Sequence, residues 1–172
     1  MEIHILRLSH RLPRDERIST HVALVARAFG ARKIIYCGQH DSGLEDSLLR
    51  ICERWGGDFA IEYSQSYKKV ISKYKKQGYS IAHLTMYGIP VQEAVPKLRG
   101  NEKILLVVGS EAVPGDVYQL SDYNISVTSQ PHSEVAALAI LLDRIFEGRE
   151  LGAIDFGGKI RIKPSEKGKE FL

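Results

Sequence analysis

Two polar loops in the C-terminal half of the chain follow strand-like segments and could together bind a small ligand. The first loop, residues 109–115, has glycine at each end and carries the carboxylate of Glu111. The second loop, residues 129–134, leads into a long apolar segment whose first helical position is predicted at Pro131. Backbone amides that are free at a helix start suit polar ligand groups. Because ligands of open α/β sheets bind outside the carboxyl ends of the strands, the two loops predict a pocket.

A third polar loop, residues 9–17, contains Arg11, Arg14 and Arg17 and is called the arginine loop below. A guanidinium group pairs with phosphate oxygens through two parallel hydrogen bonds, so this loop suits phosphate contacts. Two acidic residues between the second and third arginine could instead neutralise two of the arginines in surface ion pairs of little energetic value. Both interpretations are open at the level of sequence.

Basic residues also gather on a predicted helix over residues 66–77. They are Lys68, Lys69, Lys73, Lys75 and Lys76. A lysine-rich helix face is usually solvated, and contact with RNA is the alternative. The formal net charge of the whole chain is only +3 at pH 7, which permits a nucleic-acid partner without requiring one.

The composition is that of one globular domain. The 172 residues are enough for one sizeable core and too few for two, and the apolar and charged fractions are 44% and 26%. No segment reaches the roughly 18 apolar residues of a membrane helix, and the opening MEIHILRL predicts a strand rather than a signal peptide. We therefore expect a cytoplasmic protein without membrane contact.

Several chemistries lack their sequence motifs. Cys37 and Cys52 have no CxxC spacing, so two reduced thiols in or near the core are expected. The six histidines show no HExxH or similar ligand spacing, which predicts that the chain holds no metal. No GxGxxG motif follows the first strand, so a Rossmann-type dehydrogenase or methyltransferase finds no support.

Strand-like and helix-like segments alternate along the chain, as they do in βαβ units with a parallel sheet. The predicted strands span residues 2–8, 33–37, 59–63, 80–85, 104–108 and 124–128. The predicted helices span residues 19–29, 42–55, 66–77, 91–98 and 131–146. This pattern predicts an α/β domain over residues 1–148, with an open parallel sheet and helices on both faces.

The chain changes character after the last predicted helix. Short alternating segments at residues 151–156 and 159–163 flank Gly157 and Gly158, which predicts a β-hairpin with a basic edge. We expect this hairpin and the charged tail, together residues 149–172, to pack on the same domain.

The last predicted helix, residues 131–146, is apolar on nearly every side. Beside one apolar stripe, a second side is made apolar by Ala136, Ala137, Ile140 and Leu141. A helix of this kind is buried on two sides. We therefore expect one side to cover the sheet and the other to face the second subunit of a homodimer.

Four segments carry a resemblance to a known family. They are LRLSHRLPRDERISTHVALVARAFGA, IAHLTMYG, VGSEAVP and DYNISVTSQPHSEVAALAILLD, spread over residues 6–143. The chain resembles the archaeal tRNA (cytidine-56) 2′-O-methyltransferase family, which belongs to the SPOUT class of knotted methyltransferases and has a similar C-terminal hairpin. The resemblance implies a SPOUT-type C-terminal trefoil knot, S-adenosylmethionine as the cofactor, and methylation of cytidine 56 in the T-loop of tRNA.

The resemblance also implies that the polar loops hold the cofactor. The implied cofactor-binding residues are Leu84, Thr85, Gly109, Ser110, Glu111, Ala112, Val113, Val127, Thr128, Ser129, Gln130, Pro131, His132, Ser133 and Glu134. Backbone groups of these loops would hold the two ends of the cofactor, and apolar side chains would enclose its adenine. No metal is implied.

The reaction implied by the resemblance is attack of a ribose 2′-hydroxyl on the methyl group of the cofactor. In related enzymes an arginine lowers the proton affinity of this hydroxyl. Arg17 is the preferred counterpart here, with Arg14 as a phosphate anchor. Arg27 is the alternative, because its spacing from His21 matches an Asn and Arg pair of the wider class, although Arg27 lies closer to the following glycine. The class works as homodimers in which this loop of one subunit meets the cofactor of the other.

Two other functions would use the same residues. A non-catalytic module could hold a nucleotide or RNA in the same loops, and a ribose methyltransferase could act at another RNA position. A binding module would not need arginines at the cofactor end of the sheet, whereas a transferase acting on RNA would.

Overall fold

A single open sheet forms the centre of the molecule. The computed structural model describes residues 1–109 and 113–172. Six strands are hydrogen-bonded in the order β3-β2-β1-β5-β4-β6, and every pair is parallel. This arrangement confirms the predicted α/β fold with a parallel sheet. The elements are β1 (Glu2–His10), α1 (Glu16–Ala28), β2 (Lys33–Gly38), α2 (Ser42–Trp55), β3 (Ala60–Ser64), α3 (Tyr67–Lys76), β4 (Ser80–Pro90), α4 (Val91–Leu98), β5 (Lys103–Val108), α5 (Asp116–Leu120), β6 (Tyr123–Ser126), α6 (Glu134–Phe146), α7 (Glu150–Ala153), β7 (Ile162–Lys163) and β8 (Glu170–Phe171).

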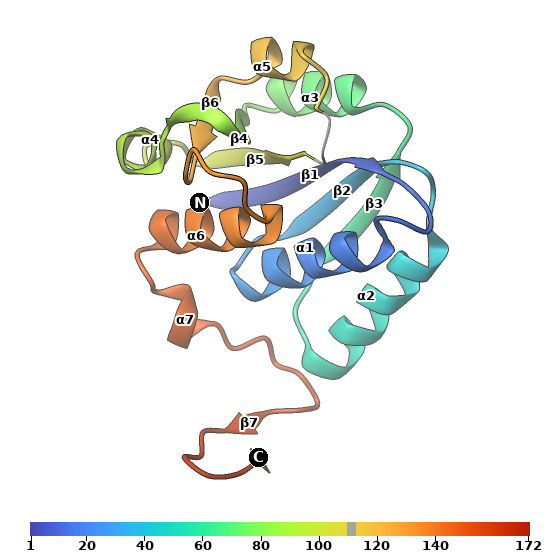
Figure 1. Ribbon diagram of the computed structural model, residues 1–172. Coiled ribbons are helices and arrows are strands. Elements are labelled where there is room, and N and C mark those ends of the chain that lie inside the picture. The colour runs from blue at the N-terminus through green and yellow to red at the C-terminus, as the bar shows by residue number, and fades with distance from the viewer. Residues whose placement is uncertain (110–112) are drawn as a thin grey trace.

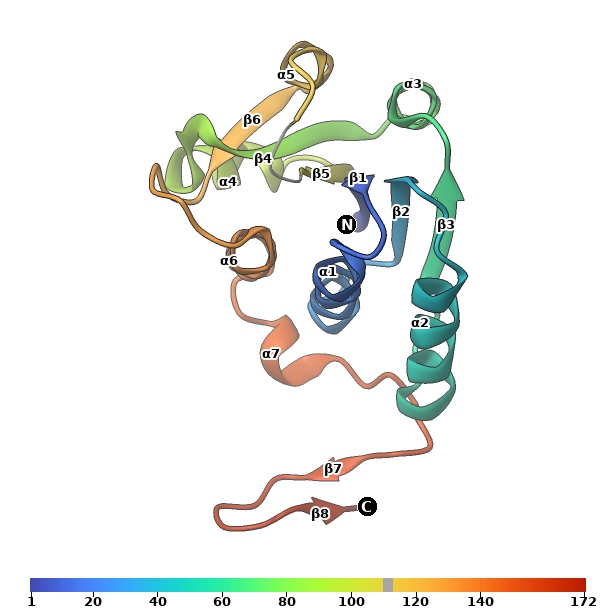
Figure 2. The ribbon, with the colours of Figure 1, turned by 45° about the vertical axis from the view of Figure 1, so that its right-hand side comes forward.

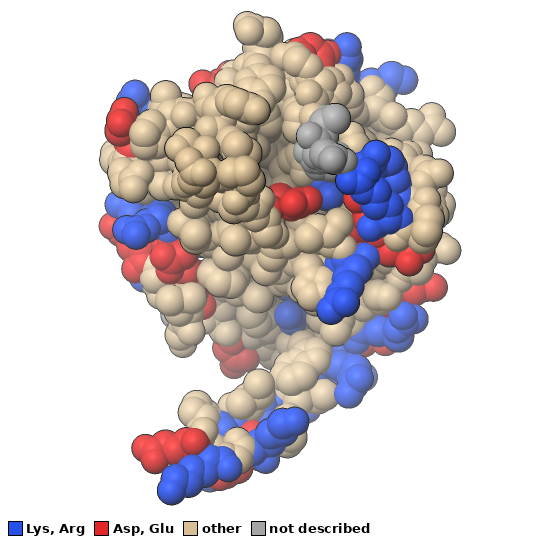
Figure 3. Space-filling model, viewed as in Figure 1, with Lys and Arg blue, Asp and Glu red and all other residues tan. Residues whose placement is uncertain are grey.

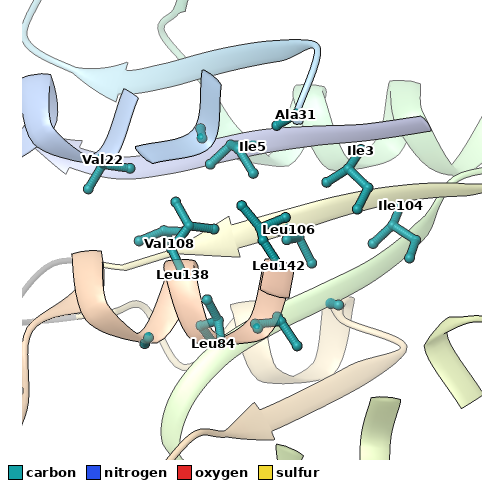
Figure 4. Packing of buried hydrophobic residues seen from close by; sticks show 14 of the residues in the cluster. Ile3, Ile5, Val22, Ala31, Leu84, Ile104, Leu106, Val108, Leu138 and Leu142 are labelled. Carbon is teal, nitrogen blue, oxygen red and sulfur yellow. The ribbon is translucent and has the colours of Figure 1, made fainter. Parts of the chain in front are cut away.

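Helices cover both faces of the sheet (Figures 1 and 2). Side chains of α1, α2, α4 and α6 share one buried cluster, and those of α3 and α5 share the other. Because successive strand residues point to opposite faces, Ile3 and Ile5 of β1 join the first cluster, and Leu6 and Leu8 join the second. Figure 4 shows the first cluster, in which Val108 at the end of β5 lies beside α6.

The six predicted strands of the sheet and the five predicted helices are confirmed, with shifts at their ends. α6 begins at Glu134 rather than at Pro131, because the hydroxyl of Ser133 accepts a hydrogen bond from the backbone N–H of Val135 and caps the helix. α1 begins at Glu16, inside the arginine loop. β4 continues to Pro90, and α5 lies in a segment that had no predicted element.

α6 buries most of its apolar residues within its own chain. Ala137 and Leu141 are 4% and 0% exposed, so the prediction that they belong to an outward side is wrong. With 3.6 residues per turn, they share the buried stripe with Leu138. Ala136 is exposed and Ile140 is 42% exposed, and these two form the outward apolar side.

The predicted C-terminal hairpin is wrong in its position. α7 takes up part of its first predicted strand, and the antiparallel pair instead joins β7 and β8, with Ile162 opposite Phe171. Gly157 does not turn a hairpin but pairs with Gly56 at the end of α2. A Cβ on Gly158 would lie 2.3 Å from the backbone of Trp55, so this glycine permits the close approach. The β7–β8 hairpin extends away from the sheet (Figure 2).

Three further sequence predictions concern thiols, membranes and metals. Both cysteines are free, and burial raises the pKa of the Cys37 thiol to about 11, in agreement with the expected reduced thiols. Within the described ranges, no helix has the length and apolarity to cross a membrane. The same ranges contain no group of three or more His, Cys, Asp or Glu side chains placed to hold a metal ion.

Candidate functional site

A cavity of about 440 Å³ opens at the carboxyl ends of β4, β5 and β6, next to the start of α6. Its size is that of a small-molecule site. Its described lining residues are Leu84, Thr85, Met86, Tyr87, Val108, Gly109, Val113, Tyr118, Ile125, Val127, His132, Glu134 and Ala137. The prediction of a pocket at this end of the sheet is therefore confirmed.

The structure brings together about half of the predicted cofactor-binding residues. The predicted residues that line the cavity are Leu84, Thr85, Gly109, Val113, Val127, His132 and Glu134. Thr128, Ser129, Gln130, Pro131 and Ser133 are close in sequence to that lining but are not part of it. Ser110, Glu111 and Ala112 lie outside the described residues.

The loop after β5 needs a glycine at its first position. A Cβ built on Gly109 would lie 2.2 Å from Cγ2 of Val113, which is closer than two non-bonded carbon atoms can approach. Gly109 therefore lets the chain leave β5 and bring the apolar side chain of Val113 into the cavity wall.

One wall of the cavity is a bulge in β4. Leu84 and Ile89 both pair with Ile125 of β6, so residues 85–88 loop out of the ladder between them. A Cβ on Gly88 would lie 2.4 Å from the backbone N of Ile125, which shows how tightly this bulge sits against β6. The bulge carries Thr85 and Tyr87 into the lining. The periodicity of the sequence predicted that this strand ends at residue 85, so it did not predict this wall of the cavity.

A neutral histidine supports the polar side of this wall. The Thr85 hydroxyl and the Tyr118 hydroxyl are 2.9 Å apart and share a hydrogen bond. The ring of His83 meets the Tyr118 ring edge-on, with centroids 4.8 Å apart. Burial lowers the pKa of His83 below its usual range, and its Nδ1 lies 3.0 Å from the side-chain oxygen of Asn124. A neutral His83 therefore holds Tyr118, which in turn orients Thr85.

A fully buried arginine that the sequence reasoning missed lies next to this cavity. Arg7 of β1 donates a hydrogen bond to the carbonyl of Gly109, and its Nη2 lies 3.0 Å from Oε1 of Glu134. Among the described residues, Nε and Nη2 have no well-aligned hydrogen-bond acceptor. Burial lowers the pKa of the guanidinium, while the charge of Glu134 opposes this shift. Arg7 therefore connects two walls of the cavity.

A sequence signal for Arg7 did exist. In β1 the residues on the side of Ile3 and Ile5 face the core under α1 and α6, and position 7 belongs to that side. A charged residue at a core position is rarely tolerated without a partner. Its partner, Glu134, is 127 residues away in sequence, so the pattern of β1 predicts that a partner exists but not which residue it is.

The arginine loop is fastened to the body by buried polar contacts. Asp15 accepts hydrogen bonds from the backbone N and from Nε of Arg11, at 3.1 and 3.2 Å. At its base, the buried ring of His10 lies 2.8 Å from the Ser19 hydroxyl and 3.2 Å from the Asp41 carboxylate. These contacts join β1, α1 and the start of α2. The prediction that acidic residues neutralise arginines holds for Arg11.

The four predicted catalytic residues lie in two places. Arg14, Arg17 and His21 are exposed, and Figure 3 shows basic side chains gathered over the end of β1 and the start of α1. None of the three is among the described lining residues of the cavity. Arg27 is 8% exposed near the other end of α1, where it donates to the carbonyl of Gly56 and lies 4.5 Å from the Phe156 ring centroid. Arg27 fastens the C-terminal segment and does not reach the cavity of its own chain.

Solved structures of RNA methyltransferases share this fold. A TrmH-family RNA methyltransferase from Porphyromonas gingivalis matches with a TM-score of 0.67 and 16% identity over 84% of this chain and 59% of that one. The SpoU methyltransferase AviRb from Streptomyces viridochromogenes, crystallised with AdoMet, matches with a TM-score of 0.62 and 18% identity. That match covers 86% of this chain and 58% of AviRb, so the chain spans about three fifths of both proteins. The chain therefore shares its α/β fold with these TrmH-family and SpoU methyltransferases.

Sequence comparison then defines the family. A tRNA (cytidine(56)-2′-O)-methyltransferase from Methanosphaera stadtmanae is 50% identical over 99% of this chain and 98% of its own length. The sequence profile of the family described as "tRNA ribose 2′-O-methyltransferase, aTrm56" matches residues 55–172. The chain belongs to the tRNA (cytidine-56) 2′-O-methyltransferase family.

Proposed function

We infer that this chain transfers the methyl group of S-adenosylmethionine to the ribose 2′-hydroxyl of cytidine 56 in tRNA. The observation that carries the inference is identity of about one half, over nearly the full length, with an enzyme named for this reaction. The cavity at the carboxyl ends of β4 to β6 supplies a place for the cofactor.

The residues of the cavity fit a cofactor of this kind. S-adenosylmethionine supplies an activated methyl group and carries both an adenine and positive charge. Leu84, Val113 and Val127 give apolar walls for the adenine, and the carboxylate of Glu134 suits a cationic group. The Glu134 side chain is 31% exposed, so it remains accessible to a ligand. We propose that these residues hold the cofactor and that Arg7 keeps Glu134 in position.

We propose that Arg17 activates the ribose hydroxyl and that Arg14 binds an RNA phosphate. A cationic guanidinium beside the hydroxyl favours loss of its proton as the new bond forms. Because neither arginine lines the cavity of its own chain, each would serve the cavity of the partner subunit in a homodimer. The contacts of Arg27 with Gly56 and Phe156 favour a structural role for that residue.

We also propose the trefoil knot of the SPOUT class over the C-terminal part of the sheet and a location in the cytoplasm. The strand order supports the knot, because the chain passes across β4 to bring β6 to the sheet edge. We further propose that residues 1–148 form the methyltransferase domain and that, of residues 149–172, the part up to residue 160 packs on it, while the β7–β8 hairpin extends away. The contact of Gly157 with Gly56 supports this packing.

Ile140→Glu should convert the dimer into monomers and abolish methylation. Ile140 is the most exposed large apolar side chain of α6, and burying an unpaired carboxylate at an interface should weaken association on the order of a hundred-fold or more. Light scattering coupled to gel filtration measures the mass, and circular dichroism checks the fold. Leu49→Glu is the control, because Leu49 is 55% exposed on α2, away from this face. A monomeric Ile140→Glu protein with full activity would contradict the proposal.

The proposed reaction is tested directly with unmodified tRNA transcript and labelled S-adenosylmethionine. Label should enter the RNA, and mapping of alkali-resistant linkages should place it at the ribose of cytidine 56. A transcript carrying 2′-deoxycytidine at position 56 is the matched control and should remain unlabelled. Measurable cofactor binding without RNA labelling would instead favour a non-catalytic module.

A further inference from the structure

We propose that Tyr87 is the platform on which the base of the target nucleotide stacks while its ribose is methylated. The proposal rests on the proposed function and deepens it, because it assigns the contact that selects and holds the RNA base at the cavity mouth. Tyr87 is absent from the residues for which the family resemblance implied a role.

The first observation is the exposure of the ring at the mouth of the cavity. Tyr87 lines the cavity and is nevertheless 82% exposed, more than any other large apolar or aromatic side chain for which the described residues give a value. A single exposed apolar residue is by itself ordinary. Its position beside the cavity is what points to a ligand.

The second observation is that the backbone under the ring is fixed. Residues 85–88 loop out between two residues, Leu84 and Ile89, that both pair with Ile125. The backbone N–H of Tyr87 donates to the Thr85 hydroxyl at 3.3 Å, and that hydroxyl is held by Tyr118. Gly88 sits against the backbone of β6. The ring is thus presented from a rigid support, which lowers the entropic cost of binding.

The chemistry of the reaction identifies the occupant. The base is attached to the ribose carbon next to the one that bears the 2′-hydroxyl, so a hydroxyl that enters the cavity leaves its base at the rim. The described lining of the cavity contains no Lys or Arg that would attract a phosphate, whereas a base needs only an aromatic face. Single-stranded and loop nucleotides are commonly recognised by stacking on Tyr, Phe, Trp or His rings. Tyr118, the other tyrosine of the lining, is instead held within the cavity wall, because its hydroxyl bonds to Thr85 and its ring packs against His83.

Tyr87→Ala should lower kcat/KM for tRNA by roughly 5- to 150-fold, the range expected for one base stacked on one aromatic ring. Its affinity for S-adenosylmethionine, measured by equilibrium dialysis, should be unchanged. Tyr87→Phe keeps the ring and should retain wild-type kcat/KM, whereas Tyr87→Leu should resemble Tyr87→Ala. Leu49→Ala, at an exposed residue of α2, is the control and should have no effect.

A tRNA with an abasic ribose at position 56 separates base stacking from every other role. This RNA keeps the reacting hydroxyl and lacks the base, so wild type and Tyr87→Ala should methylate it with the same kcat/KM. A penalty that persists on abasic RNA would overturn the proposal. A parallel loss of cofactor affinity would assign Tyr87 to the cofactor instead, and a fall in dimer mass would assign it to the subunit interface. If wild type fails to methylate position 56 of intact tRNA, the proposed function itself fails.

Discussion

Arg17→Ala should slow methylation by roughly 10²- to 10³-fold while the affinity for S-adenosylmethionine stays at the wild-type value. Arg17 is exposed in the first turn of α1 and lines no part of its own cavity, so its removal should disturb neither the fold nor cofactor binding. The loss should come from the step in which the 2′-hydroxyl gives up its proton. Single-turnover kinetics with saturating tRNA measure this step.

Arg11→Ala is the matched control for that prediction. Arg11 belongs to the same loop, but its side chain already pairs with Asp15, and its backbone N–H keeps a hydrogen bond to that carboxylate after the substitution. Its turnover should therefore stay close to wild type. Unchanged turnover in Arg17→Ala would move the catalytic assignment to Arg14.

Mixed dimers can test whether Arg17 acts across the subunit interface. Val127→Trp should fill the cofactor cavity, since Val127 lines it. Neither Arg17→Ala nor Val127→Trp homodimers should methylate RNA at an appreciable rate. A heterodimer of the two should regain one working site, with the intact cavity of one subunit beside the Arg17 of the other. No recovery in the heterodimer would show that the arginine serves its own chain.

Arg7→Met should weaken S-adenosylmethionine binding by about ten-fold or more, because Glu134 loses its ion-pair partner and the carbonyl of Gly109 loses a charged donor. It should also lower the free energy of unfolding by about 1–3 kcal/mol, less than for a fully buried ion pair, since Glu134 regains water. Equilibrium dialysis and chemical denaturation measure the two effects separately.

Two further variants distinguish positioning from general destabilisation. Glu134→Gln should also weaken the cofactor, and it should lower stability as well, because it leaves the charge of the buried Arg7 without a carboxylate. Lys33→Met breaks another ion pair, with Glu62 between β2 and β3, and should leave cofactor affinity unchanged. If Arg7→Met lowers stability but binds the cofactor normally, Arg7 is a structural residue only.

The fold was predictable from sequence because its signals are local. Apolar runs such as residues 104–108 are buried on both faces, and the alternation of strands and helices fixes a parallel sheet. The position of the cavity followed from the rule that ligands bind at the carboxyl ends of such strands. The hairpin was misplaced because a Gly-Gly pair is compatible both with a tight turn and with a close contact between chain segments. Here Gly157 and Gly158 form a close contact, since Gly158 lies against the backbone of Trp55, which is distant in sequence.

The missing parts of the site depend on contacts between residues distant in sequence. The bulge that presents Tyr87 exists because two residues of β4, Leu84 and Ile89, pair with the same residue of β6, Ile125. The periodicity of residues within β4 does not reveal this double pairing. The role of Arg7 depends on Glu134 at the start of α6. Helix capping by Ser133 displaced the predicted helix start, because a hydroxyl cap outweighed the preference for proline in the first turn.

The buried link from Ser19 through His10 to Asp41 has a consequence for the speed of RNA capture. It orders the arginine loop before any RNA arrives, so little conformational entropy remains to be lost at the moment of encounter. Association should then be governed by diffusion and by the attraction between guanidinium and phosphate, which salt screens, rather than by a slow rearrangement of the protein. A loop fixed in this way favours rapid sampling of many RNA molecules over tight retention of one.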